Sequence, residues 1–370
     1  VADISSGRVS VAIIEISHKG IPNVLVEEHV TLPFQDGGQE ASVAGIIKTL
    51  GEVSEKALGA YSKKSARSPH ISIAYACLHA PFICSKTIRA EHVFNERTLI
   101  GRAIISDLGK QALETDTELA HKKIFESSVV RIELNGYPTA KPEGKHASRI
   151  ATSILFSEDT ANIRSGISET LSRVFACPPP KVRARSSAIL SVLKENDILK
   201  KYCFVVDIGS QVTSLMTVRK DVATEIAHVP EGSSSILKRI AGEKMPEETL
   251  TMLRMLALGE CETEACEAIK QAVARAEPDL VRIFGETMAK MAAERRLPDN
   301  LILLAPKEFS EWLVQFFSRL DFAQFTITTR PFSPRIGFDQ VPSLTLENGV
   351  SLDSDLSIAC ALVNIEEMRA

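Results

Sequence analysis

The sequence predicts a duplicated, two-domain α/β fold with a small α+β subdomain inserted into the first domain. Three observations lead to this prediction. Residues 1–32 alternate apolar and polar residues as in a three-strand meander, and residues 203–229 repeat that pattern about 200 residues later. Each meander is followed by helical periodicity, and residues 86–157 interrupt the first half with a different pattern. The chain of 370 residues is long enough for two domains.

The first half is predicted to contain three strands, a long helix and a further strand. The runs at residues 9–13 and 24–32 alternate as strands do, and Gly20 and Pro22 mark the turn between them. Residues 42–65 place apolar side chains at helical spacing. Residues 69–78 return to strand alternation, which completes a compact α/β unit.

Residues 86–157 are predicted to form the inserted subdomain. An amphipathic helix is expected at residues 94–114, with Asn95 as its N-cap and Leu99 and Leu108 on its apolar face. Strands are expected at residues 129–134 and 150–156, and Asn135 and Gly136 form a typical hairpin dipeptide. The next helix, at residues 158–175, should end before the prolines at positions 178–180.

The second half is predicted to repeat this plan with three strands, several helices and one further buried strand. The turn after the third strand contains Gly232, and Pro278 is expected to break the longest helix. The strands are expected at residues 203–208, 212–218, 223–229 and 300–306, and the helices at residues 233–242, 246–258, 262–297 and 307–320.

Composition and charge exclude several classes of protein. A net charge of −4 gives no global basic field, so nucleic acid is not an expected partner. No apolar run approaches the ~20 residues of a membrane-spanning helix. The seven scattered cysteines are typical of a reducing compartment, which predicts a cytoplasmic protein. The histidines lack metal-site spacing and no G-x-S-x-G motif occurs, so neither a metal centre nor a serine hydrolase is expected.

Two aspartate-tipped hairpins are the strongest functional signal. The stretch "VADISSGRVSVAII" brings Asp3 to a hydroxyl-rich turn, and "FVVDIGSQVT" brings Asp207 to another. A carboxylate at a strand end can hold a hydrated divalent cation while the N–H groups of the turn surround phosphate oxygens. One such hairpin from each domain would hold a nucleotide in a cleft between them. The alternative is that both are plain, solvated β-turns.

The order of these motifs resembles the actin-like (ribonuclease H-like) ATPase superfamily, and within it the bacterial FtsA/PilM branch. The two hairpins resemble its first and second phosphate motifs, and "VPEGSSSILKRIAGE" resembles the stretch after the second meander. The segment "ELNGYPTAKPEGKHASRIATSILFSED" is similar to the inserted subdomain of that branch, and "SLDSDLSIACALVNIEE" is similar to its closing helix. The resemblance spans nearly the whole chain.

The resemblance implies five consecutive segments around a nucleotide cleft. The first domain is expected to be discontinuous, because the FtsA/PilM-type subdomain is inserted into it and a C-terminal helix returns to it. The segments are the first actin-like domain at residues 1–85, the inserted subdomain at 86–157, the return to the first domain at 158–200, the second actin-like domain at 201–345 and the C-terminal helix at 346–370.

The same resemblance implies ATP and Mg²⁺ as ligands, and it implies which residues would contact them. Asp3 and Asp207 would face the Mg²⁺ ion, if one is bound. No residue is assigned a catalytic role. The residues implied for the phosphates are Ser5, Ser6, Gly7, Arg8, Gly209, Ser210, Gln211 and Thr213, and those for the ribose and adenosine are Gly232, Ser233, Glu247, Glu248 and Ala305.

Four of these elements depart from the family pattern. The first turn carries its glycine at Gly7 instead of position 5, and Ser210 and Gln211 replace two glycines of the second turn. Arg185 stands where relatives supply a polar residue that orients the attacking water, and losing this function costs ~10²–10⁴-fold in rate. Ala305 replaces a glycine of the adenosine motif. We therefore expect weak nucleotide binding and weak or lost hydrolysis.

The expected function is that of a scaffold. Such a protein would self-associate into filaments or dimers, or recruit a protein of a membrane complex in cell division or in type IV pilus or secretion assembly. It would act in the cytoplasm at the inner face of the membrane, with membrane contact indirect or through terminal residues outside this sequence. The alternatives are an active MgATP-dependent actin-like ATPase and a small-molecule kinase of the same fold.

Overall fold

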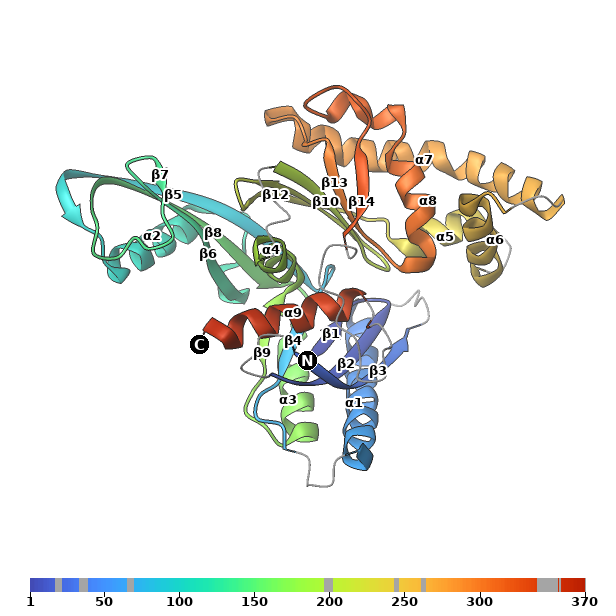
Figure 1. Cartoon of the computed structure of the whole chain (residues 1–370), viewed down its shortest axis with the longest axis horizontal. Helices are drawn as coiled ribbons and strands as arrows, with labels where there is room; N and C mark the ends of the chain where they lie inside the picture. Colours follow the sequence, from blue (N-terminus) through green and yellow to red (C-terminus); the bar gives the residue numbers. More distant parts are fainter. Residues whose placement is uncertain are drawn as a thin grey trace.

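The computed structural model describes residues 1–16, 22–32, 39–64, 70–195, 202–242, 246–260, 264–337, 352 and 354–369. Its strands form two five-stranded sheets and one four-stranded sheet. Figure 1 shows the two larger sheets below and above the centre of the molecule, with α4 (Arg185–Glu195) and α9 (Ser354–Arg369) between them. Among the described residues, no helix is both long and apolar enough to cross a membrane.

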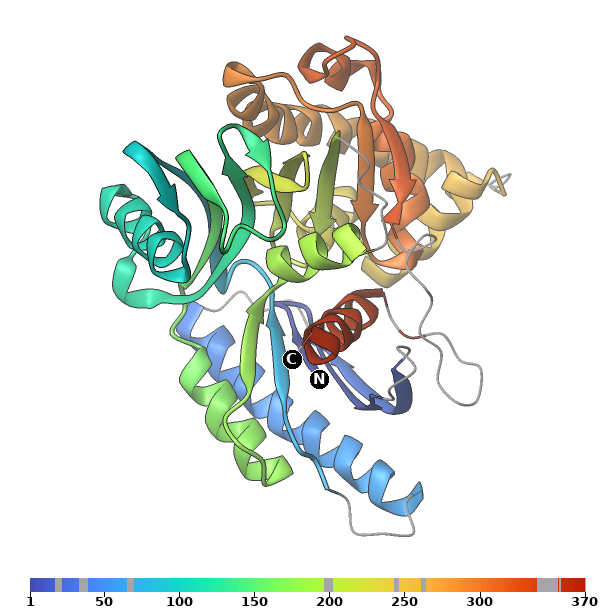
Figure 2. The same ribbon diagram turned by 60° about the vertical axis from the view of Figure 1, so that its left-hand side comes forward.

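The first sheet contains the predicted meander and two parallel strands. Helices α1 (Gln39–Lys64), predicted at residues 42–65, and α3 (Arg164–Phe175) pack together against one of its faces (Figure 2). The turn residue Gly20 lies outside the described residues. In spatial order the strands are β3 (Asn23–Thr31), β2 (Arg8–Glu15), β1 (Ala2–Ile4), β4 (Tyr75–Leu78) and β9 (Lys181–Ala184).

Strand alternation gives this sheet one apolar face and one partly polar face. Ala2 and Ile4 point toward α1 and α3, where they join Leu78 in a buried core. Asp3 stands between them in sequence, so it points to the opposite face. Helix α9 packs on that face, and Asp3 is therefore only 4% exposed.

The second sheet repeats the arrangement of the first. Phe204 and Val206 point into a core beneath the outer helices, whereas Val205 and Asp207 point the other way, toward α4. Asp3 and Asp207 therefore lie on the sheet faces that are turned toward α4 and α9. In spatial order the strands are β12 (Val222–Val229), β11 (Thr213–Arg219), β10 (Tyr202–Ile208), β13 (Asn300–Leu304) and β14 (Ser333–Ile336), of which the sequence did not predict the last.

Four helices cover the outer face of the second sheet: α5 (Ser233–Ala241), α6 (Pro246–Leu258), α7 (Glu264–Glu294) and α8 (Lys307–Phe317). The predicted break at Pro278 is wrong, because α7 continues through this residue. Proline removes one N–H donor from a helix. Ala276 and Leu280, on either side of Pro278, are buried in the core, and this packing holds the helix together across the missing bond.

The third sheet lies in the segment predicted as an insertion, and α2 (Arg102–Thr115) packs on one of its faces. Asn135 and Gly136 have positive φ angles of 51° and 84° and join β6 to β7, so the predicted hairpin turn is confirmed. In spatial order the strands are β5 (Ile83–Leu99), β8 (His146–Asp159), β6 (Ile124–Leu134) and β7 (Tyr137–Pro138).

The helix predicted at residues 94–114 is wrong in its first part. Residues through Leu99 belong to strand β5, and the helix begins only at Arg102. Local apolar spacing favours a helix there, but Thr98 and Leu99 pair with Ala147 and His146 of β8. Those pairing partners are distant in the sequence, so no local pattern could reveal that this interaction outweighs helical propensity.

Helix α3 also begins later than predicted, at Arg164 instead of residue 158. Strand β8 runs through Asp159, and the carboxylate of Asp159 accepts hydrogen bonds from the N–H groups of Ile163 at 3.1 Å and Arg164 at 3.2 Å. These bonds satisfy donors of the first helical turn. At the other end Ala176 adopts the left-handed conformation before the three prolines, which confirms the predicted stop.

Helix α9 packs on the first sheet. Leu356 and Cys360 pack on Ala12 and Val24 of the first sheet. Ile358, on another side of the helix, packs with α4 and with residues of the second sheet. One helix therefore contacts both large sheets.

Phe284→Ala is expected to lower the free energy of unfolding by about 3–5 kcal/mol, because it leaves a cavity in the second core. Phe284 is fully buried, and its ring lies 5.8 Å from that of Phe316 and 5.3 Å from that of Phe317. Trp312 stacks on Phe316, so its fluorescence during denaturant unfolding reports on this core. Leu320→Ala, at a residue that is 79% exposed, should change stability by less than about 0.5 kcal/mol.

Candidate functional site

The two aspartate-tipped turns are in direct contact. Gly7 of the first turn lies so close to Ser210 of the second that a Cβ added to Gly7 would stand 2.3 Å from the Cβ of Ser210. No pair of side chains tolerates such an approach. The fold therefore brings together the two turns predicted to hold phosphates, but at this point it leaves no gap between them.

Backbone groups of the first turn form hydrogen bonds within the turn, whereas the buried Ser6 hydroxyl has no hydrogen-bond partner among the described residues. The N–H of Ser5 donates to the carbonyl of Arg8 at 3.0 Å, and the N–H of Arg8 donates to the Ser5 hydroxyl at 3.1 Å. Ser5 and Ser6 are buried, and the guanidinium of Arg8 lies 3.9 Å from Glu27 on β3. These donors are therefore directed within the first sheet instead of across to the second turn.

The second turn is held against the N-terminus of α5. The N–H of Gly209 donates to the carbonyl of Val212 at 3.0 Å. The carbonyls of Gly209 and Ser210 accept from the N–H groups of Ser233 and Ser234 at 2.8 and 3.0 Å. Helix N-termini offer N–H groups to anions, but here two of those N–H groups already donate to this chain's own carbonyls.

Three further predicted phosphate and ribose residues belong to this second turn. A Cβ on Gly232 would stand 2.4 Å from the carbonyl oxygen of Ser210, so only glycine allows the turn and α5 to meet. Thr213 is buried and donates its hydroxyl hydrogen to the carbonyl of Glu231 at 2.7 Å. Gln211 is half-buried beside them. The structure thus brings Gly209, Ser210, Gln211, Thr213, Gly232 and Ser233 together.

The residues predicted near the adenosine are more dispersed. Glu247 and Glu248 are exposed on the first turn of α6, at the outer side of the second half (Figure 1). Ala305 directly follows β13, at the sheet end where Asp207 of β10 pairs opposite Leu304. Ala305 is buried with the aromatic residues of the second core, so its side chain serves packing.

Arg185, the first residue of α4, lies among three carboxylates. Its Nη2 is 2.6 Å from Asp355 of α9 and 3.4 Å from Asp207 of β10, and its side chain is 3% exposed. Burial alone would lower the pKa of Arg185, but Asp355, Asp207 and Asp3 raise it above its ordinary value. The guanidinium therefore stays charged inside the protein, in contact with Asp207 and within electrostatic reach of Asp3.

Asp3 has a second cationic partner in His79, which directly follows β4. The Nε2 atom of His79 lies 2.9 Å from Oδ1 of Asp3, and both residues are buried. Burial alone would raise the pKa of Asp3, but His79 and the more distant Arg185 outweigh it and lower that pKa. In return, burial opposes the charged form of His79, and Asp3 raises the pKa of the imidazole above its usual range. The pair therefore favours carboxylate and imidazolium.

The neighbouring thiol of Cys77 does not make this group a nucleophilic triad. Burial, and then the charge of Asp3, raise the pKa of Cys77 well above its ordinary value. A thiol that keeps its proton is a poor nucleophile. Asp3 and His79 therefore act on each other and not as an activating base for Cys77.

This arrangement does not fit Mg²⁺ with ATP phosphates. Mg²⁺ demands oxygen ligands and retains several waters, whereas Asp3 and Asp207 face an imidazole and a guanidinium. The cavity beside Asp207 has a volume of about 20 Å³, enough for a single water, against ~300–1,000 Å³ for typical ligand pockets. Two larger hollows, of about 660 and 780 Å³, share no lining residue with it.

Sequence reasoning treated Arg185 only as a departure from a motif, and it missed His79 and Asp355. The available signals are weak. His79 stands two residues after Cys77 at a strand end, and Asp355 stands in the first turn of the closing helix. The contacts of His79 and Asp355 cannot be inferred until β4 is known to lie beside β1 and α9 to pack on the first sheet.

No protein-family model and no curated protein matches this sequence. Solved structures do match. A "PilM-PilN type IV pilus biogenesis complex" shares 12% identity, with 98% of this chain and 97% of that chain covered and a TM-score of 0.62. Two further structures are less similar. The ethanolamine utilization protein EutJ from Carboxydothermus hydrogenoformans shares 12% identity, with 98% of this chain and 88% of that chain covered and a TM-score of 0.45. The apo psk41 ParM protein shares 12% identity, with 98% and 83% covered and a TM-score of 0.37.

At such low identity, structural similarity shows the fold alone. The fold class predicted from the sequence is confirmed: this chain has the two-domain, actin-like ATPase fold. The two similar sheets, each with an aspartate on the face turned toward α4 and α9, are the internal evidence for the same conclusion.

Gly7→Ala is expected to destabilise the protein by about 1–3 kcal/mol, because the new Cβ would overlap that of Ser210. The double variant Gly7→Ala/Ser210→Gly removes the second Cβ and should recover most of this loss. Denaturant unfolding of the wild type, both single variants and the double variant measures the coupling. Strictly additive effects would show that the two turns do not touch in solution.

Asp355→Asn is expected to flatten the dependence of stability on pH between about pH 4 and pH 6. Burial raises the pKa of Asp355 to about 6 in spite of Arg185, whereas an unfolded aspartate has a pKa near ~3.9. The folded protein binds the Asp355 proton more tightly than the unfolded chain does, so stability falls as the pH rises through that window. Since 35% of the side chain is exposed, the slope should stay well below ~1.4 kcal/mol per pH unit.

Thermal unfolding at about pH 4.5 and about pH 6.5 measures this difference. Asp107→Asn, at an exposed carboxylate 3.5 Å from Lys110, is the control and should leave the pH dependence unchanged. Equal pH dependence in the wild type and Asp355→Asn would contradict the assignment.

Proposed function

We propose that this protein is an actin-like scaffold of the FtsA/PilM type, which self-associates or recruits a protein of a membrane complex, and whose ATP hydrolysis is weak or lost. The single observation that carries the proposal is the buried ion-pair cluster around Arg185. A nucleotide-driven protein needs space for Mg²⁺ and phosphates between its two hairpins. Here a cation that belongs to the chain stands beside the aspartates.

Opening this cluster for a nucleotide would be unfavourable. Separating Arg185 from Asp207 while both stay buried costs ~3–5 kcal/mol, which weakens a ligand by about a hundredfold or more. Binding must also part Gly7 from Ser210. These two costs act together against MgATP, and they favour a protein whose two halves keep one arrangement.

The third sheet supports a role in protein interaction. Val93 and Tyr137 are 65% and 77% exposed, and Leu99 and Val129 of the same sheet are also exposed. These side chains lie on β5, β6 and β7 of one sheet, and each offers exposed apolar surface to another protein. We therefore propose residues 86–157 as the subdomain that contacts another copy or a partner.

The kind of partner is proposed by analogy with the PilM structure, which was solved as a complex with PilN. A protein of a membrane-bound pilus or secretion assembly is the corresponding partner here, and a cell-division complex is the alternative. The protein would act in the cytoplasm at the inner face of the membrane, which it reaches through that partner. Its first domain would comprise residues 1–85, 158–200 and 346–370, and its second domain residues 201–345.

An active MgATP-dependent ATPase is the second candidate. The observation in its favour is that Asp3 and Asp207 still lie on the sheet faces turned toward each other. Such an enzyme would have to separate Gly7 from Ser210 in each cycle and move Arg185 away from Asp207.

Purified protein is expected to release phosphate from MgATP no faster than the Asp207→Ala variant, because Arg185 and the touching turns exclude the phosphates. Calorimetric titration with MgATP should give little or no heat of binding. Self-association, measured by sedimentation, should be the same with and without MgATP.

Steady phosphate release that Asp207→Ala abolishes would instead identify an active ATPase. Assembly that appears only with MgATP would contradict a nucleotide-independent scaffold. Glu52→Ala, at an exposed carboxylate of α1 outside every implied nucleotide contact, is the control for the loss of a carboxylate and should behave like the wild type in both measurements.

A further inference from the structure

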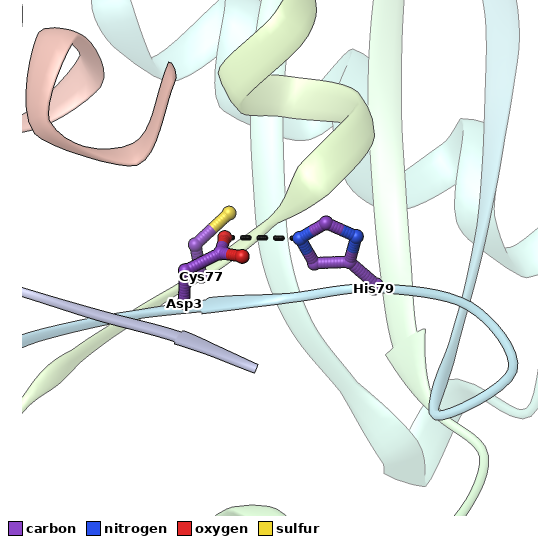
Figure 3. A group of neighbouring side chains, drawn as sticks. All are labelled: Asp3, Cys77 and His79. Carbon is purple, nitrogen blue, oxygen red and sulfur yellow. Dashed lines mark hydrogen bonds and ion pairs between the residues drawn. The ribbon is translucent and has the colours of Figure 1, made fainter. Parts of the chain in front are cut away.

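Asp3, Cys77 and His79 form a buried group that we call the Asp–Cys–His cluster. Their carboxylate, thiol and imidazole ligand atoms all lie within 4.8 Å of one another. Figure 3 shows His79 bonded to Asp3 and the thiol of Cys77 beside the same carboxylate. Each of the three residues is no more than 4% exposed. The proposed scaffold function uses Asp3 and His79 only as an ion pair and gives Cys77 no role.

The sheet itself places these side chains on one face. Asp3 of β1 is the register partner of Cys77 of β4, and partners in register point to the same side of a sheet. His79 stands two residues after Cys77 and so points to that side as well. The backbone N–H of His79 donates to the carbonyl of Ile4 at 3.1 Å, which continues the hydrogen bonding between β1 and β4 past the end of β4. The backbone therefore sets the three positions in advance.

We propose that the Asp–Cys–His cluster binds a divalent transition-metal ion, with Zn²⁺ as the best match. Imidazole nitrogen, thiolate sulfur and carboxylate oxygen are its usual protein ligands. Metal–ligand bonds of ~2.0–2.3 Å in a tetrahedron separate the ligand atoms by about 3.4–3.6 Å. The ligand atoms of the cluster lie within 4.8 Å of one another, so they must move by no more than about 1.4 Å to reach this geometry, and the 2.9 Å contact between Asp3 and His79 must open by about 0.5 Å.

The charges around the cluster suit a divalent ion. Binding breaks the S–H bond of Cys77 and removes the proton from the His79 nitrogen that becomes a ligand. A metal–sulfur and a metal–nitrogen bond form, and two protons are released to solvent. The thiolate and the carboxylate of Asp3 then carry two negative charges, which balance the ion. The nearby charge of Arg185 is met by Asp207 and Asp355, so the bound ion adds no uncompensated positive charge.

The fourth ligand of the metal ion would be a water molecule, and the Ser10 hydroxyl would form a hydrogen bond with it. Ser10 pairs opposite Asp3 on β2, so the two side chains share a face. Its hydroxyl is buried and has no hydrogen-bond partner among the residues that the structure describes. Buried hydroxyls are normally bonded, and a water on the metal ion would satisfy this one. Three protein ligands and one water form an open zinc site.

The same ligands select against Mg²⁺, which prefers an octahedron of oxygen atoms. The cluster offers one carboxylate together with nitrogen and sulfur. It therefore differs from the Mg²⁺ site that the sequence resemblance implies for Asp3 and Asp207. The proposal is independent of nucleotide binding, so it stands or falls separately from the scaffold function.

The full chain, freed of metal by a chelator and dialysed against Zn²⁺, is expected to retain about one ion per chain in elemental analysis. Mg²⁺ should not be retained. Loading with Co²⁺ should produce thiolate-to-cobalt charge-transfer absorption, which reports directly on Cys77. Cys77→Ser and His79→Gln should each weaken Zn²⁺ affinity about tenfold or more.

Cys203→Ser is the matched control, since Cys203 is an equally buried thiol on β10 of the second sheet. It should retain Zn²⁺ like the wild type, and Zn²⁺ should raise the Tm of both. Circular dichroism identifies variants that fold, and His79→Gln leaves the thiol in place if Cys77→Ser does not fold. Absence of retained Zn²⁺ in the wild type, or equal retention by a folded Cys77→Ser or His79→Gln variant, would overturn the proposal.

Discussion

The buried guanidinium of Arg185 is the interaction on which the rest of this structure depends. It begins α4 and is bound by Asp207 of the second sheet and Asp355 of α9, within electrostatic reach of Asp3 on the first sheet. A buried charge is tolerated only while its partners stay in place, because losing one leaves an uncompensated ion in a poorly solvated interior. A single side chain therefore links both sheets and the closing helix. The cleft is closed by charge compensation as well as by packing.

The two turns follow from this closed arrangement. With the sheets held together, Gly7 and Ser210 touch, and the carbonyls of the second turn accept hydrogen bonds from N–H groups of α5. A nucleotide site needs free N–H donors and a removable cation, whereas this chain uses those donors internally and carries its own cation. This closed arrangement is the basis for proposing a scaffold instead of a nucleotide-driven protein.

The elements that the sequence predicted well are those whose pattern is local. The strands of both meanders follow short apolar runs, and β10 and β11 are buried on both faces. Helix α6 has the predicted bounds because the apolar spacing that predicts it lies within the helix itself. Three of the errors involve distant partners, whereas the strand predicted at residues 69–78 is simply shorter, at Tyr75–Leu78. Strand β5 exists because of β8, β14 exists because of β13, and α7 passes Pro278 because the core holds it on both sides.

By itself the sequence determined the duplicated fold and singled out Asp3 and Asp207, because strand alternation and turn composition are properties of short stretches of chain. It also marked Arg185 as unusual, without a reason. Only the tertiary structure decided what these residues do. His79, Asp355 and Arg185 come from β4, α9 and α4, and they meet the aspartates only when parallel strands pair and the last helix returns to the first sheet. Electrostatic interactions inside a protein depend on distance and burial, and the spacing of residues along the chain determines neither quantity.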